Sequence, residues 1–233
     1  MRPIAILRFS RTEGPAYFAD WLDARGLPWQ LVALDAGAHV PRDPRDFAGI
    51  GMMGGPMSVN DALPWIEPAC ALLRDAVDAR VPVIGHCLGG QLLARALGAT
   101  VARAAQTEIG WIDVDATADA ASWFGERQRF TAFQWHYDAF ELPRGATRVL
   151  ANAFNPNQGY TIDDRHIGLQ CHVEMTADLV DTWCRAAPDE LPGVSTPALM
   201  SEADIRAGLD ARIAHLNGVA SSIYTRWATK LAH

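Results

Sequence analysis

A single cysteine stands at a glycine-crowded corner of this sequence. Cys87 lies where an apolar run gives way to a helical pattern of Leu and Ala, with Gly85 before it and Gly89 and Gly90 after it. A sharp strand-to-helix turn raises its central side chain above the sheet and strains the backbone there, so the neighbouring residues must be small. A helix that begins at Leu88 would direct its first amides and its positive dipole end at the sulfur, which favours the thiolate. We therefore predict a nucleophilic cysteine and not an inert thiol at a packing corner.

A cysteine nucleophile needs a base, and the base needs a group that orients it. The segment LQCHVEMT offers His172 and Glu174 near the end of an expected strand. Because side chains alternate along a strand, these two share one side, while Cys171 and Val173 point to the other. Glu174 could then hold the imidazole while His172 faces Cys87. An ordinary histidine and glutamate at a solvated strand end would show the same spacing.

The segment GMMGGPMSVND could supply the third part of such a site. Two adjacent glycines and a proline at a strand end leave a backbone N–H free to point at a ligand, which suits an oxyanion hole. The glycines from Gly49 to Gly54 also spell G-x-G-x-x-G, but the first two fall inside the expected strand and no helix follows directly. We therefore expect no dinucleotide site, and a Walker phosphate loop would require a Lys-Ser/Thr pair that this segment lacks.

Four segments together resemble a known family. GGPMSVND, GHCLGGQLLARALGA, QWHYDAFELP and LQCHVEMT occur in this order at suitable spacing. They are similar to class I glutamine amidotransferase domains, particularly the stand-alone group that resembles the glutaminase domain of GMP synthetase. The likeness is strong over about residues 45–176. It implies a catalytic triad and two backbone oxyanion donors, which would be Cys87, His172 and Glu174 for the triad and Gly55 and Leu88 for the donors.

The same resemblance implies how a substrate would be held. The side chain of Gln91 would help to hold glutamine, and the backbone around four further residues would seat its α-amino and α-carboxylate groups, namely Met57, Trp135, His136 and Tyr137. Two positions depart from the family pattern. Val173 replaces a common proline that would stiffen the strand end, and Tyr137 stands where a small residue is common. We expect the tyrosine to narrow or partly cap the pocket.

The four cysteines do not form a pattern typical of metal binding or disulfides. They are Cys70, Cys87, Cys171 and Cys184, scattered without a C-x-x-C pair. A zinc site made from the two adjacent His–Cys pairs is disfavoured, because neighbours on a strand point apart and cannot easily converge on one ion. We expect no metal and no cofactor.

The elements that must position these groups alternate between strand and helix in the first half of the chain. We predict strands at 3–9, 29–34, 47–54, 81–86, 110–116, 129–135, 146–153 and 167–173, and helices at 15–26, 65–80, 88–98 and 176–187, followed by a helical tail from about residue 202. This order indicates an α/β fold: a flavodoxin-like three-layer sandwich with a mainly parallel central sheet, a nucleophile elbow, extra strands and a helical C-terminal tail.

We expect one domain over residues 1–233, with a helical C-terminal extension at about 189–233. The 233 residues carry a formal net charge of -7 and no cluster of Lys and Arg, which argues against a nucleic-acid partner. No apolar run approaches the roughly 18 residues that span a bilayer, and Arg8 interrupts the first apolar run too early for a signal peptide. A cytoplasmic protein without membrane partners is expected.

The function that we predict is hydrolysis of the γ-amide of glutamine through a γ-glutamyl thioester, with ammonia passed to an acceptor subunit such as a synthetase. The chain shows no ATP-binding synthetase module of its own. Two alternatives stay open: a stand-alone hydrolase of a small γ-glutamyl compound, and a non-catalytic binding module of the same fold.

Overall fold

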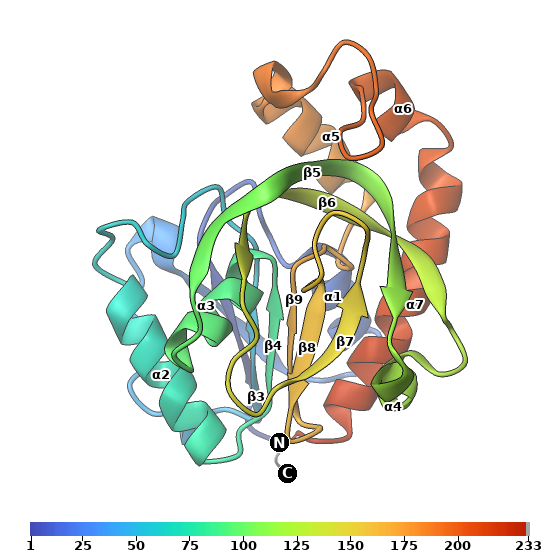
Figure 1. The fold of residues 1–233 in the computed structure, drawn as a ribbon. Coiled ribbons are helices and arrows are strands. Elements are labelled where there is room, and N and C mark those ends of the chain that lie inside the picture. The colour runs from blue at the N-terminus through green and yellow to red at the C-terminus, as the bar shows by residue number, and fades with distance from the viewer. Residues whose placement is uncertain (232–233) are drawn as a thin grey trace.

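The computed structural model describes residues 1–231 and shows a layered α/β architecture (Figure 1). The strands are β1 (Ile4–Arg8), β2 (Trp29–Ala33), β3 (Gly49–Met52), β4 (Val83–His86), β5 (Val101–Ala116), β6 (Arg129–Phe140), β7 (Thr147–Ala151), β8 (Gly159–Ile162) and β9 (His166–Leu169). The helices are α1 (Ala16–Asp23), α2 (Ile66–Asp78), α3 (Leu88–Ala96), α4 (Ala121–Phe124), α5 (Ala177–Ala186), α6 (Glu202–Arg206) and α7 (Leu209–Ala228). The predicted α/β class is confirmed.

Within the described residues the strands form one open sheet of nine strands in the order β2-β1-β3-β4-β9-β8-β7-β5-β6. Pairing is parallel from β2 through β9 and antiparallel from β9 through β6. The strands that alternate with helices are thus the parallel ones, as the sequence pattern predicts. The extra strands of the second half continue the same sheet.

Two hydrophobic layers cover the parallel half of the sheet. Along β1, Ile4 and Ile6 pack in the cluster that includes α1 and α7, whereas Ala5 and Leu7 pack in the cluster that includes α2 and α3. This alternation is the period of a strand buried on both faces. It produces the three layers expected from the sequence, with Cys87 at the edge where the parallel strands end.

The antiparallel half is dominated by a long hairpin of β5 and β6. Its register shifts between Arg103 and Glu108, and in Figure 1 the hairpin arches across the sheet beneath α5 and α6. Both strands extend beyond the ranges predicted for them. The short strand β8 and the single turn of α4 were not predicted, because four residues are too few to show a period. The strand predicted at 167–173 ends earlier, at Leu169.

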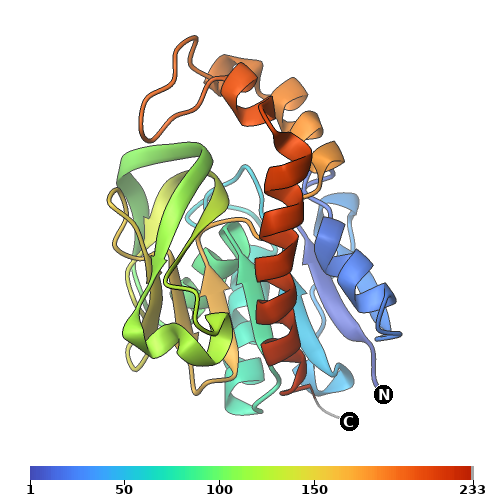
Figure 2. The same cartoon turned by 90° about the vertical axis from the view of Figure 1, so that its right-hand side faces the viewer.

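The predicted C-terminal extension contains two helices separated by Gly208, whose φ of 64° lies in the left-handed region. Residues 189–201 are mostly loop, and 232–233 lie outside the described residues. The long helix α7 runs along the sheet beside α1 (Figure 2) and buries Tyr224 and Trp227 completely. A Cβ added at Gly49 in β3 would lie 2.8 Å from the Trp227 ring, so α7 packs directly on the parallel sheet. None of the helices in residues 1–231 has the length and apolarity to cross a membrane.

Candidate active site

Cys87 occupies the turn between β4 and α3 with a strained backbone. Its φ of 47° and ψ of -106° lie in a region that non-glycine residues rarely adopt. A Cβ at Gly85 would collide with the backbone of Gly89, and one at Gly90 would lie 2.5 Å from the carbonyl oxygen of Leu169. Helix α3 is therefore packed against the ends of β4 and β9 so closely that only glycine fits. This geometry is the elbow that the sequence predicts.

The imidazole of His172 lies between a thiol and a carboxylate. Its Nδ1 is 2.7 Å from Oε1 of Glu174, and the ring also interacts with the Cys87 side chain. Because Nδ1 is engaged by the carboxylate, Nε2 is the nitrogen left for the sulfur. All three side chains are buried. The structure thus brings together the three residues predicted for the triad.

The backbone holds His172 although β9 has already ended. The N–H of His172 donates to the carbonyl of Phe133 in β6 at 2.8 Å, and the two residues form an isolated antiparallel bridge. The ring of Trp183 from α5 packs edge-on against the imidazole, with centroids 4.7 Å apart. Cys171 is fully buried, and burial raises the pKa of its thiol, which keeps it protonated.

Electrostatics favour a charged pair at His172 and Glu174. Burial opposes ionisation of both groups, but each charge stabilises the other. Burial lowers the pKa of His172, yet the negative charges of Glu174 and Cys87 raise it well above its usual value. Burial raises the pKa of Glu174, while the positive charge of His172 and then that of His86 lower it to about 2. His172 can therefore carry a second proton as an imidazolium and hold that proton next to the sulfur of Cys87.

Two backbone amides next to Cys87 are free to bind a negative oxygen. Within residues 1–231 neither the N–H of Gly55 nor that of Leu88 donates to an acceptor in the chain. The two residues are in contact, because a Cβ at Gly55 would lie 2.6 Å from Cδ2 of Leu88. Leu88 is the first residue of α3, so its amide also carries the positive end of the helix dipole. Paired donors of this kind can stabilise an oxyanion.

A cavity of about 380 Å³ opens above the thiol, large enough for a molecule the size of glutamine. The structure brings all five predicted substrate-binding residues to its wall, together with Gly55 and Cys87, and these five are Met57, Gln91, Trp135, His136 and Tyr137. Sequence reasoning missed other residues of the wall, among them Glu13, Arg103, Asp138 and Glu190. They carry charge, but nothing in their local pattern marks them.

The side chain of Gln91 is held in a network that reaches the nucleophile. Its Nε2 donates to the carbonyl oxygen of Asp138 at 3.0 Å and to Oε1 of Gln170 at 3.2 Å. Gln170 in turn directs its Nε2 at the sulfur of Cys87, at 3.6 Å. The amide of Gln91 is therefore fixed at the floor of the cavity.

His136 is held away from the thiol by its own contacts. It is buried, its Nδ1 lies 3.2 Å from the carbonyl oxygen of Asp138, and its Nε2 lies 3.4 Å from Oε1 of Glu108. His86 is also engaged elsewhere, since its two nitrogens contact the carbonyl of Met52 at 3.0 Å and the hydroxyl of Tyr224 at 3.2 Å. These contacts leave His172 as the imidazole that reaches the sulfur.

Tyr137 forms part of a roof over the cavity. Its hydroxyl donates to Oε2 of Glu190 at 2.5 Å, and Nε1 of Trp135 donates to the same oxygen at 2.7 Å. The guanidinium of Arg103 stacks on the Tyr137 ring, 4.4 Å from its centroid. Glu190 lies in the segment after α5, which is far from the β5–β6 hairpin in the sequence. The roof over the cavity is therefore formed by two separate parts of the chain. The expectation of a partly capped pocket is consistent with this arrangement.

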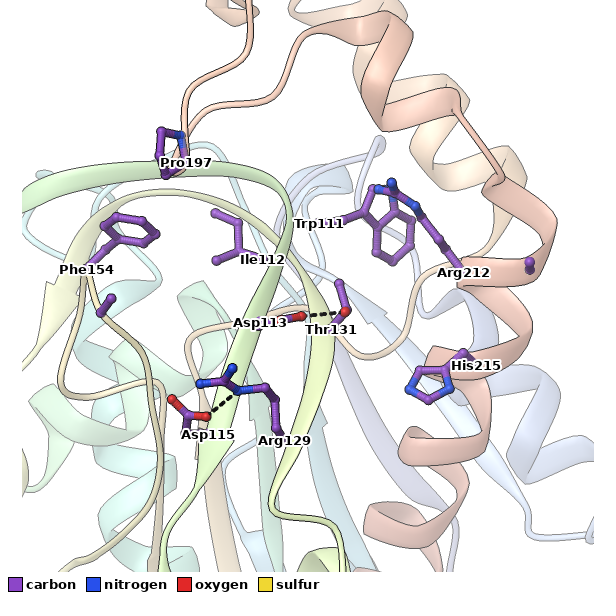
Figure 3. Close-up of a pocket in the computed structure, with 12 residues that line it drawn as sticks. Trp111, Ile112, Asp113, Asp115, Arg129, Thr131, Phe154, Pro197, Arg212 and His215 are labelled. Atoms are coloured by element: carbon purple, nitrogen blue, oxygen red, sulfur yellow. Dashed lines mark hydrogen bonds and ion pairs between the residues drawn. The ribbon is translucent and has the colours of Figure 1, made fainter.

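A second, wider hollow of about 760 Å³ lies between the β5–β6 hairpin and α7 (Figure 3). Two of its acidic groups have partners within the hollow: Nε of Arg129 lies 2.6 Å from Oδ1 of Asp115, and the hydroxyl of Thr131 donates to Asp113 at 2.6 Å. No cysteine lines this hollow within the described part of the chain. The candidate active site is therefore the smaller cavity above Cys87.

Comparison with known proteins shows which family the chain is similar to. The profile of the family described as glutamine amidotransferase class-I matches residues 19–182. The chain is 29% identical over 189 residues to the glutamine amidotransferase-like protein YfeJ of Salmonella typhimurium, covering 77% of this chain and 78% of the relative. It is 32% identical over 159 residues to a glutamine-hydrolysing GMP synthase of Aeropyrum pernix, which covers 65% of this chain but only 29% of that longer protein.

Two further likenesses extend the comparison. Gamma-glutamyl peptidase 4 of Arabidopsis thaliana is 26% identical over 171 residues, covering 70% of this chain and 68% of the relative. The crystal structure of a glutamine amidotransferase from Methylobacillus flagellatus superposes with a TM-score of 0.97 at 44% identity, covering all of this chain and 96% of its own. With the family profile matching most of the chain, the protein belongs to the class I glutamine amidotransferase family.

Proposed function

We propose that this protein hydrolyses the γ-amide of glutamine or of a γ-glutamyl compound through a covalent thioester on Cys87. The observation that carries the proposal is the buried contact chain from the Cys87 thiol through His172 to Glu174, set beside two free backbone amides. A nucleophile, its base, an orienting group and oxyanion donors are the parts that acyl transfer requires. Family membership supports amide hydrolysis in general terms.

The reaction follows from the position of each group. With the thiol proton held on His172 as an imidazolium, the sulfur of Cys87 attacks the γ-carbonyl carbon. The carbonyl oxygen becomes negative and accepts hydrogen bonds from the N–H groups of Gly55 and Leu88. When the C–N bond breaks, His172 gives its proton to the departing nitrogen, leaving a γ-glutamyl thioester. Water then loses a proton to His172 and attacks the thioester, which releases glutamate and the thiol.

The fate of the released nitrogen divides the proposal into two forms. In an amidotransferase, ammonia passes to an acceptor subunit, and the likeness to GMP synthases supports this form. In a stand-alone hydrolase, the amine simply leaves, and the likeness to a gamma-glutamyl peptidase supports that form. The roof made by Glu190 over Tyr137 and Trp135 favours the second form, because the chain covers its own site without a partner.

The experiment is turnover of glutamine and a panel of γ-glutamyl amides by the purified full chain, with glutamate and ammonia as readouts. Cys87→Ala should abolish turnover, whereas Cys70→Ala, which removes a buried thiol from α2, should retain it. Turnover by the protein alone supports the hydrolase, and turnover only after addition of a cell extract supports the amidotransferase. A folded protein that is inert under both conditions would leave the non-catalytic binding module as the better description.

A further inference from the structure

The carboxylate of Glu13 faces the cavity beside the imidazole of His172. Glu13 lies in the loop between β1 and α1 and lines the cavity with Thr12. A Cβ built on Gly54 would collide with Oε2 of Glu13 and would lie 2.8 Å from Cε1 of His172. The carboxylate and the imidazole therefore converge on the same glycine, whose missing side chain makes room for both.

This carboxylate has no hydrogen-bond partner in the described part of the chain. Within residues 1–231 no hydrogen bond or ion pair to the Glu13 side chain is formed, and burial raises its pKa to about 7. The indole of Trp183, which lines the same cavity, is already used, since its Nε1 donates to the carbonyl of Thr12 at 2.7 Å. A half-buried carboxylate without a donor is costly, and a ligand that supplies a donor or a positive charge there relieves that cost.

The chemistry of the proposed reaction identifies which part of a substrate reaches Glu13. The departing nitrogen must lie beside Nε2 of His172, because Nδ1 is occupied by Glu174. The ring atom beside Glu13 is Cε1, which is bonded to both ring nitrogens. A group attached to the departing nitrogen at Nε2 therefore passes the Cε1 edge of the imidazole, where Glu13 lies. Gln91 and Tyr137, which are predicted to hold the γ-glutamyl half, line the same cavity.

The acidic side chains of the cavity wall outnumber its basic ones. Three acidic side chains line it, from Glu13, Asp138 and Glu190, and its one arginine, Arg103, is stacked on the ring of Tyr137. A negatively charged group on the leaving side would meet Glu13 as a like charge, whereas a positively charged one would pair with it.

We propose that Glu13 is a specificity-determining residue that selects a leaving amine bearing a second, positively charged nitrogen. The preferred substrates are then γ-glutamyl amides of diamines or polyamines rather than γ-glutamyl peptides, whose leaving group ends in a carboxylate. This inference rests on the proposed γ-glutamyl hydrolysis and adds no covalent step to it. Glu13 forms an ion pair with the part of the substrate that departs.

The test compares three γ-glutamyl amides of similar size, made from ethylenediamine, propylamine and glycine, so that the leaving group is cationic, neutral or anionic. At pH 8 we expect kcat/KM for the cationic amide to exceed that of the neutral one by about tenfold or more, the usual value of a hydrogen bond to a charged group. Glu13→Gln keeps the shape and should remove that preference while raising the rate with the glycine amide. Glu126→Gln removes an exposed carboxylate outside the cavity and should change none of the three ratios.

A Glu13→Gln variant that slows all three amides equally, or that retains the cationic preference, would overturn the inference while leaving the hydrolase intact. If the full chain turns over none of the amides, the proposed function fails, and the inference is judged by binding. Titration calorimetry with the Cys87→Ala variant should then show the cationic amide binding about tenfold more tightly than the neutral one, with Glu13→Gln in the same background removing the difference. Equal affinities for the two amides would refute the role of Glu13.

Discussion

Replacing Glu174 with glutamine tests the central contact of the site. The substitution keeps the size of the side chain but removes the negative charge that lies 2.7 Å from Nδ1 of His172 in a fully buried position. We expect two consequences. The protein loses stability, because an imidazolium buried without its counter-charge is costly, and the thiol becomes less reactive, because the imidazole loses its orientation and its charge.

The loss of stability can be estimated from the pKa of the carboxyl group. Burial raises this pKa, but the charges of His172 and then His86 outweigh burial and lower it from 4.5 to about 2. At about 1.4 kcal/mol per unit the net shift corresponds to about 3 kcal/mol at neutral pH. That figure lies at the lower end of the roughly 3–5 kcal/mol seen when one member of a buried ion pair is removed. We expect the loss of turnover to reach about a thousandfold or more, still less than that of Cys87→Ala, because Glu174 forms no bond to the substrate.

The sign of the pH dependence follows from the direction of the shift. A carboxyl whose folded pKa is lowered stabilises the fold above its unfolded pKa of about 4.5, and this contribution disappears as the pH falls through about 2. The difference in the free energy of unfolding between wild type and Glu174→Gln should therefore be full at pH 7. It should fall to roughly half at pH 3.

Urea unfolding at pH 7 and pH 3 measures the stability, and alkylation of Cys87 by a glutamine-like chloroketone measures the reactivity without requiring an acceptor. The reasoning is refuted if the variant alkylates within about threefold of the wild-type rate, or if its stability deficit is the same at both pH values. Either result would mean that the carboxylate neither orients nor charges His172. The His172→Ala variant provides the comparison for complete loss of the base.

Three other predictions concern the surroundings of this contact. The chloroketone should modify Cys87 alone, because Cys171 is fully buried with a raised thiol pKa, and mass spectrometry showing label on Cys171 would mean that the nucleophile is misassigned. Gly85→Ala should lower the thermal midpoint by several degrees, since its Cβ would meet the backbone of α3 and overpacking typically costs about 1–3 kcal/mol; an unchanged midpoint would contradict the close packing. Tyr137→Phe removes the hydroxyl that donates to Glu190, so KM should rise by about threefold to tenfold with little change in stability, and an unchanged KM would show that the roof plays no part in retaining substrate.

Much of the fold could be predicted because it depends on short-range patterns. Short apolar runs mark β1, β3 and β4, and helical spacing marks α2 and α3. The elbow at Cys87 can likewise be predicted from a short segment, because the thiol, its flanking glycines and the strand-to-helix boundary lie within a few consecutive residues. The confirmed α/β class follows from the alternation of these elements. The structure also places the five predicted substrate-binding residues around one cavity.

Other features are decided only when distant segments pack together. His172 lies beyond the end of β9, and its position is fixed by a hydrogen bond to Phe133 in a strand that the sequence alone does not place next to it. Glu13 and Glu190 reach the cavity from segments outside the strands and α-helices, where side chains follow no repeating pattern. In the sequence, a carboxylate that lines the cavity therefore cannot be told apart from a carboxylate exposed to solvent. The surroundings of these two side chains come from contacts between residues far apart in the chain. Burial by such contacts changes the pKa of a group such as Glu13. The sequence by itself therefore determined the candidate nucleophile and the layers, whereas tertiary packing decided which charged groups face the cavity above Cys87.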